Sequence, residues 1–130
     1  MLNEYTRTYK AVGNGNTSYV NRVEVSVFYY KGGHNWFYGG YEDRGYYFSI
    51  DGYGLEDHGN GLFSRELHIG KGAQGHKWCI LPCERQSKKR YESAKAQIDE
   101  LTDKLLGRWL EENDIVLESM EYEVEERDRR

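Results

Sequence analysis

The chain has 130 residues and a formal net charge of −4, a size that suits a single domain. Hydrophobic residues make up 38% of it and charged residues 31%, and no run of apolar residues approaches the roughly 20 that a membrane-spanning helix needs. The first residues, Met1–Glu4, lack the basic and then apolar layout of a secretory signal. We therefore expect a cytoplasmic protein that does not act at a membrane.

The first eighty residues show the period-two alternation of β-strands. Within residues 19–30, valines at every second position alternate with polar residues, so that one face of this strand is apolar. Glycine and asparagine at 13–16 and two glycines at 32–33 mark the turns on either side. We expect an antiparallel meander with strands over 5–12, 19–30, 36–38, 44–51, 63–69 and 77–81.

The period changes to that of a helix after residue 86. Apolar residues then recur at steps of three and four, which is the spacing of one helical stripe. Ser87 is the expected N-cap, because its hydroxyl can accept a hydrogen bond from a free backbone N–H. This pattern predicts one long amphipathic helix over 87–112 that packs on one face of the sheet. The stripe consists of Tyr91, Ala94, Ile98, Leu101, Leu105 and Trp109.

Residues 115–124 return to period two, with apolar residues on one face and glutamates on the other. Glutamates on an exposed strand discourage pairing with a further strand, so this segment is predicted to be a short final edge strand. The expected fold class is α+β: a twisted antiparallel β-sheet with one long C-terminal helix on one face. We expect one domain over residues 1–125, followed by a charged C-terminal tail over 126–130.

No motif predicts a reaction, a metal or a cofactor. The segment Gly70–Gly75 fits G-x-G-x-x-G, but it precedes a predicted strand, whereas a dinucleotide site needs a helix there. The four histidines form no H-x-x-x-H pair. Cys79 and Cys83 lie in a segment that reads as extended chain, which places them too far apart for a disulfide, so both are expected to be free thiols. We expect a non-enzymatic protein with no catalytic residue, metal site or cofactor.

Aromatic residues are the feature that points to binding. They make up 15% of the chain, and residues 28–53 contain 11 of the 19. Neighbours such as Tyr46 and Tyr47 point to opposite faces of a strand, so a single core cannot hold every ring. The rings either form cross-strand pairs that stabilise the sheet or anchor a partner, since tyrosine and tryptophan are enriched at binding hot spots.

The charge distribution separates two kinds of partner. Residues 1–80 are neutral overall, residues 81–110 carry +2 and residues 111–130 carry −6, and the acidic end favours a basic partner protein. The glycine-bounded loops supply the candidate partner-binding residues Trp36, Phe37, Tyr38, Tyr41, Glu42, Asp43, Glu56 and Asp57. The alternative is single-stranded nucleic acid, bound by sheet tyrosines and by the basic residues Arg85, Lys88, Lys89 and Arg90.

Three segments carry a resemblance to a group of proteins: Glu4–Val12, Arg44–Tyr47 and Cys83–Lys89. They resemble small uncharacterised accessory proteins of bacterial conjugative elements and phages, over most of the chain up to Leu117. The resemblance implies a mobile-element protein in the cytoplasm of a bacterial host, and it implies no catalytic residues.

Small, acidic, tyrosine-rich α+β proteins from that setting are similar to anti-CRISPR inhibitors. Such inhibitors bind an RNA-guided nuclease and occupy its nucleic-acid channel or another functional surface. The resemblance therefore implies a protein-binding inhibitor of a bacterial defence nuclease. The alternative in the same setting is a single-stranded nucleic-acid-binding accessory protein of a mobile element.

Overall fold

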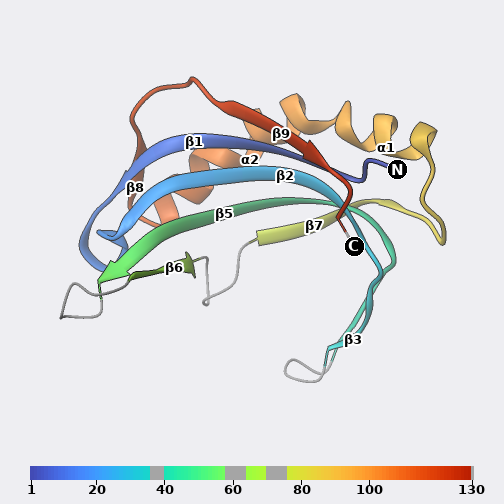
Figure 1. Ribbon diagram of the computed structural model, residues 1–130, viewed down its shortest axis with the longest axis horizontal. Helices are drawn as coiled ribbons and strands as arrows, with labels where there is room; N and C mark the ends of the chain where they lie inside the picture. The colour runs from blue at the N-terminus through green and yellow to red at the C-terminus, as the bar shows by residue number, and fades with distance from the viewer. Residues whose placement is uncertain (36–39, 58–63, 70–75, 130) are drawn as a thin grey trace.

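The computed structural model describes residues 1–35, 40–57, 64–69 and 76–129. These residues form a curved, seven-stranded antiparallel sheet with two helices behind it, and a two-stranded ribbon projects from one end (Figure 1). Neither described helix is long and apolar enough to cross a membrane. The elements are β1 (Glu4–Gly13), the 3-10 turn η1 (Gly15–Thr17), β2 (Val20–Tyr30), β3 (Gly33–Asn35), β4 (Gly40–Glu42), β5 (Gly45–Asp57), β6 (Ser64–Ile69), β7 (His76–Pro82), α1 (Lys88–Lys95), α2 (Ile98–Glu112), β8 (Ile115–Leu117) and β9 (Glu123–Arg127).

The sheet is antiparallel as expected, but its strands are not arranged as a meander. β2 lies between β1 and β5, and these three long strands form the centre of the sheet. The 13 residues of β5 pair with β7 near their start and with β6 near their end. On the other edge, β1 pairs with both β9 and β8, the last strands of the chain. β1 and β5 are each long enough to pair with two short strands along one edge. In this way β8 and β9 both lie beside β1.

The core lies between the sheet and the two helices. Val23, Val25 and Val27 of β2 face the helices and are fully buried, as the alternation predicts. The same face of β5 contributes Phe48 and Ile50, which are opposite Val27 and Val25 in the strand register. The helices close the core with apolar side chains that include Tyr91, Ile98, Leu106 and Trp109.

The single long helix expected over 87–112 is wrong, because the structure contains two helices. Ser87 is the N-cap of α1, as predicted, and its hydroxyl oxygen accepts a hydrogen bond from the backbone N–H of Arg90 over 3.1 Å. At the junction, the Gln97 N–H donates to the Ala94 carbonyl, which tightens the turn and separates α1 from α2.

The break also changes which residues of α2 are buried. Thr102 and Leu106 are buried alongside Ile98 and Trp109, whereas the predicted stripe residues Leu101 and Leu105 are only half-buried. Two shorter helices follow the curved sheet, which one straight helix over 87–112 would not do (Figure 1).

The final strand is also divided. β8 and β9 are separate, and β9 extends to Arg127, so the first two residues of the expected tail are paired with β1. Every residue of β9 is exposed, in keeping with a strand at the edge of the sheet. The Glu4 carboxylate, which is buried, accepts hydrogen bonds from the guanidinium groups of Arg127 and Arg129. These ion pairs hold the C-terminal segment against the first strand.

Thr102 provides a test of the packing beneath α2. Its hydroxyl is buried and has no hydrogen-bond partner among the described residues. The substitution Thr102→Val replaces that hydroxyl with a methyl group of similar size, and we expect it to raise the free energy of unfolding by about 1 kcal/mol. Thr102→Ser keeps the hydroxyl and removes the methyl group, so it is expected to lower stability. Urea unfolding of both variants checks this, and a Val variant less stable than the parent contradicts it.

Candidate partner-binding site

The ribbon of β3 and β4 forms an arm that continues β2 and β5 beyond the sheet (Figure 1). The arm bends at Gly32 and Gly33, whose φ angles of 67° and 120° favour glycine. A Cβ atom on Gly32 would lie only 2.4 Å from the Glu42 carbonyl oxygen of the returning chain. The two segments that form the arm therefore approach so closely at its base that only glycine fits at position 32.

Side chains from the sheet brace the base of the arm. Lys77 of β7 places its ammonium nitrogen 3.0 Å from the Glu42 carboxylate and 4.2 Å from the centre of the Tyr30 ring. The Tyr47 hydroxyl donates to the Asp43 carbonyl over 2.5 Å, and Arg44 donates to the Lys31 carbonyl over 3.0 Å. A two-stranded ribbon alone is marginally stable in water, so these contacts are what hold the arm in place.

The electrostatics of the base match this geometry. The hydrogen bond from Tyr30 lowers the pKa of Glu42, and the Lys77 ammonium lowers it further. The same hydrogen bond raises the pKa of Tyr30. Glu42 is therefore ionised and Tyr30 neutral at physiological pH, which is the state that the brace requires.

The predicted partner-binding residues do not form one surface. Tyr41 is 81% exposed on the arm, with its ring 6.3 Å from that of His34, and Asp43 is exposed beside it. Glu42 faces Lys77 and serves the brace. Glu56 and Asp57 lie at the far end of β5, paired with β6, and so do not join the arm. Trp36, Phe37 and Tyr38 lie outside the described residues.

Cross-strand packing accounts for most of the described rings between residues 28 and 53. Tyr46 is buried toward α1, with its ring 6.3 Å from Tyr91. Tyr47 is buried on the other face, with its ring 6.1 Å from Phe28 and 5.4 Å from Tyr30. Both faces of the sheet thus hold aromatic rings, and Tyr41 is the described ring in this stretch that is left exposed.

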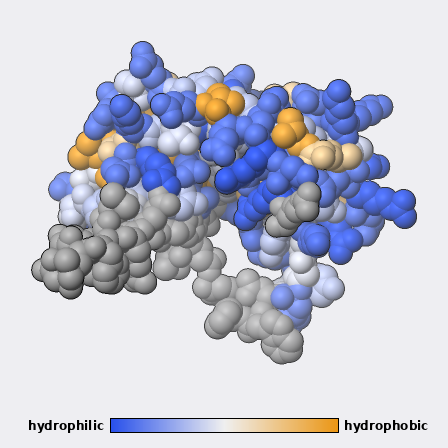
Figure 2. Space-filling view, viewed as in Figure 1, coloured by the Kyte–Doolittle hydropathy of each residue, from blue (hydrophilic) through white to orange (hydrophobic). Residues whose placement is uncertain are grey.

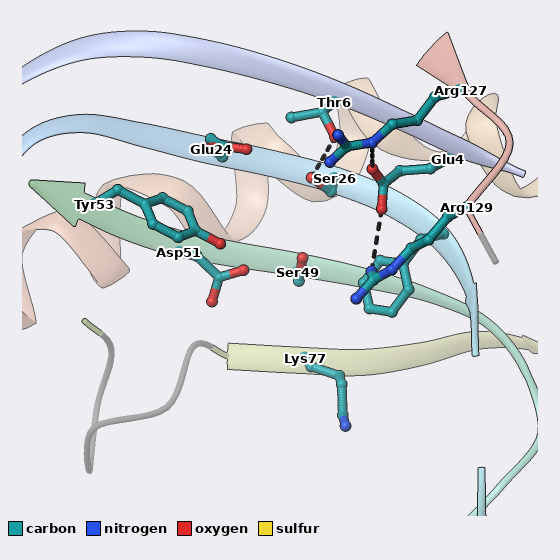
Figure 3. A pocket seen from close by; sticks show the side chains of 11 residues that line it. Glu4, Thr6, Glu24, Ser26, Ser49, Asp51, Tyr53, Lys77, Arg127 and Arg129 are labelled. Atoms are coloured by element: carbon teal, nitrogen blue, oxygen red, sulfur yellow. Dashed lines mark hydrogen bonds and ion pairs between the residues drawn. The ribbon is translucent and has the colours of Figure 1, made fainter. Parts of the chain in front are cut away.

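The face of the sheet opposite the helices, here called the helix-free face, carries a site that the sequence motifs did not reveal. It is largely hydrophilic (Figure 2) and contains a trough of about 390 Å³. Thr6, Ser26 and Ser49 form the floor of this trough, because they are adjacent in the register of β1, β2 and β5 (Figure 3). Glu24 and Asp51 lie beside the floor and are also opposite each other. The period-two alternation that buries the valines also places these polar residues together on the opposite face. The sequence did not single them out as a site, because polar residues on one face of a strand ordinarily indicate only contact with solvent.

The basic residues of the nucleic-acid alternative do form a cluster. Lys88, Lys89 and Arg90 are exposed at the start of α1, and Arg90 donates to the Arg85 carbonyl over 3.3 Å. The nearby sheet tyrosines instead hold the chain that leads into α1. The Tyr29 hydroxyl donates to the Glu84 carbonyl over 3.0 Å, so its ring is fixed in a structural contact.

Among the described residues, no group of three or more His, Cys, Asp or Glu side chains is arranged to hold a metal ion. Cys79 and Cys83 are free thiols, as their spacing predicts. Comparison of the chain with protein-family models, with curated proteins and with solved structures found no match. The case for a function therefore depends on the surfaces described above.

The brace makes the order of the arm sensitive to acid. The folded-state pKa of Glu42 is lowered. The contribution of Glu42 to the stability of the braced arm is therefore fully present above the ordinary pKa of 4.5, and it is lost as the pH falls through the lowered value. We expect the arm amides to be ordered at neutral pH and mobile in stronger acid, and mobile at every pH in Glu42→Gln. NMR order parameters of residues 33–35 and 40–42 measure this, with Glu100→Gln on the exposed side of α2 as the control. An equally ordered arm in Glu42→Gln would contradict the assignment.

Proposed function

We propose that this protein is a non-enzymatic, protein-binding inhibitor that docks onto a basic surface of a bacterial defence protein, with an RNA-guided nuclease as the expected partner. The observation that carries the proposal is the braced arm, which holds Tyr41 out from the body at 81% exposure. A tyrosine this exposed offers a large ring to a partner.

The brace favours binding through the arm. Association costs free energy when mobile segments must become ordered, and an element that is already held in place avoids part of that cost. Gly32 fixes the bend, and the contacts of Lys77 with Glu42 and Tyr30 fix the base. The arm is therefore suited to insert Tyr41 into a pocket of the partner, the role in which tyrosine is enriched at hot spots.

Surface charge supports a basic partner. Asp43 is exposed at the base of the arm, and Glu123 and Glu125 are exposed on β9. The register places both glutamates opposite threonines of β1 that belong to the helix-free face. Carboxylates on this face can take the place of phosphates against a surface lined by arginine and lysine, and they accelerate encounter at low salt.

A cleavage assay with purified RNA-guided nucleases of different types tests the proposal. We expect the protein to block DNA cleavage by at least one of them, and Tyr41→Ala to weaken inhibition by about 30-fold or more, the size of a hot-spot contact. Met120→Ala is the matched control, since Met120 is an exposed apolar residue in the segment between β8 and β9, far from the arm (Figure 1). Cleavage by every nuclease in the presence of the protein rules out the nuclease as partner. Full inhibition by Tyr41→Ala rules out the arm.

The alternative, an accessory protein that binds single-stranded nucleic acid, is favoured by one observation: the exposed cluster of Arg85, Lys88, Lys89 and Arg90. If the cluster binds phosphates, a labelled oligonucleotide will bind at about 50 mM salt, and Lys88→Glu with Lys89→Glu will abolish binding. Lys104→Glu, on the exposed side of α2, is the control. Under the inhibitor proposal we expect no binding by fluorescence anisotropy, because the sheet tyrosines near the cluster are already packed.

A further inference from the structure

The strand β9 forms one edge of the sheet (Figure 1). Among the residues that the structure describes, it pairs with β1 and with no other strand. All five of its residues are exposed. An edge strand presents a row of N–H and C=O groups without partners, and such a row can pair with a further strand. The outer edge of β9 is therefore available to an added strand.

Contacts toward the body of the protein hold β9 in place. Glu126 accepts hydrogen bonds from Tyr91 over 2.8 Å and from Lys95 over 2.6 Å, both on α1. Arg127 contacts the buried Glu4 carboxylate of β1. These contacts are directed toward α1 and β1, away from the outer edge. The strand is thus already ordered, which removes part of the free-energy cost of binding to it.

The side chains along this edge are acidic. Residues 118–126 include five glutamates and no basic residue. Glu126 is paired with Lys95, whereas Glu123 forms no ion pair within the described part of the chain. Glu125 lies 3.6 Å from Arg127, but both side chains are more than half exposed, so solvent largely screens this pair.

Basic residues on the same face lie farther in. Lys10 of β1 and Arg22 of β2 line a hollow together with Glu123. Arg22 also forms an ion pair with Glu24 over 3.1 Å. Both cations come from strands on the inner side of β9, and the segment that leads into β9 carries none. The outer side of the edge therefore favours a positively charged partner.

The side-chain pattern of β9 matches that of an added strand. Glu123 and Glu125 share the helix-free face, because they are opposite Thr8 and Thr6 in the register. Their Cα atoms are about 7 Å apart along the strand, which is also the spacing of alternate residues in a neighbouring strand. Val124 lies on the other face and is 52% exposed. A strand with cations at every second position and apolar residues between them fits both faces of this edge.

We propose that the outer edge of β9 binds an extended, basic segment of the partner protein as an additional strand. Main-chain hydrogen bonds to β9 would supply the affinity. Lysine or arginine side chains at every second position would pair with Glu123 and Glu125. This binding mode rests on the proposed function for the identity of the partner. The edge and the arm are separate surfaces, so each can fail while the other holds.

NMR titration of the full chain with a synthetic peptide tests the edge. The probe alternates lysine with valine and threonine, and the titration is made at low salt, where screening is weakest. Its control has the same sequence with every backbone nitrogen methylated, which keeps the charge and removes the main-chain donors. We expect the unmethylated peptide to shift the amides of residues 123–127 and slow their exchange with solvent, and the methylated peptide to do neither. Equal binding of both peptides, or no shift at β9, would overturn the proposal.

Glutamine variants test the recognition of charge. Glu123→Gln combined with Glu125→Gln should weaken binding of the lysine peptide roughly two- to thirtyfold, the range for two cross-strand ion pairs. Glu100→Gln combined with Glu111→Gln makes the same charge change at exposed positions of α2 and should leave binding unchanged. Unchanged affinity in the β9 variant would contradict the assignment. Concentration-dependent shifts of β9 without peptide would also contradict it, since a second copy would then occupy the edge.

The titration contains no nuclease, so its result is independent of the cleavage assay. Peptide binding without inhibition of any nuclease would support the edge and reject the nuclease as partner. Inhibition without peptide binding would reject the edge alone.

Discussion

The alternation of side chains along β2 is the constraint on which the rest of the structure depends. Val23, Val25 and Val27 are fully buried on one side, while Glu24 and Ser26 line the trough on the other. A slip of one residue in the pairing would exchange the two sets and place a carboxylate in the core. One register therefore determines the core, the polar floor and the direction in which the arm leaves the sheet.

The edge of the sheet depends on contacts between segments far apart in the chain. β9 is exposed at every residue, so apolar burial contributes little to holding it. Glu126 of β9 instead accepts hydrogen bonds from Tyr91 over 2.8 Å and Lys95 over 2.6 Å, both on α1. Together with the arginine contacts to Glu4, these bonds attach the C-terminal strand to a helix on one side and to the first strand on the other. These contacts also bring Arg127 and Arg129 to the lining of the trough on the helix-free face.

The local pattern of the sequence predicted the valine face of β2 and the Ser87 cap, because each depends on residues close in sequence. It did not predict which strands are neighbours, since period two specifies a face but not a partner. Glu42 and Asp43 are adjacent acids, and only the contact with Lys77, 35 residues away, shows that Glu42 is used internally. Glu56 and Asp57 were grouped with the arm although the length of β5 carries them away from it. The trough was missed because its residues come from strands that the sequence alone does not align.

The position of β1 has a consequence for how the chain matures on the ribosome. β1 emerges long before its outer neighbours, β8 and β9, which end at Leu117 and Arg127. Its outer edge stays open until translation has passed those residues, and such late, long-range pairings slow folding and expose unfinished sheets to aggregation. The nascent chain therefore completes this edge of the sheet only after residues 115–127 have been synthesised, long after the strand that they pair with.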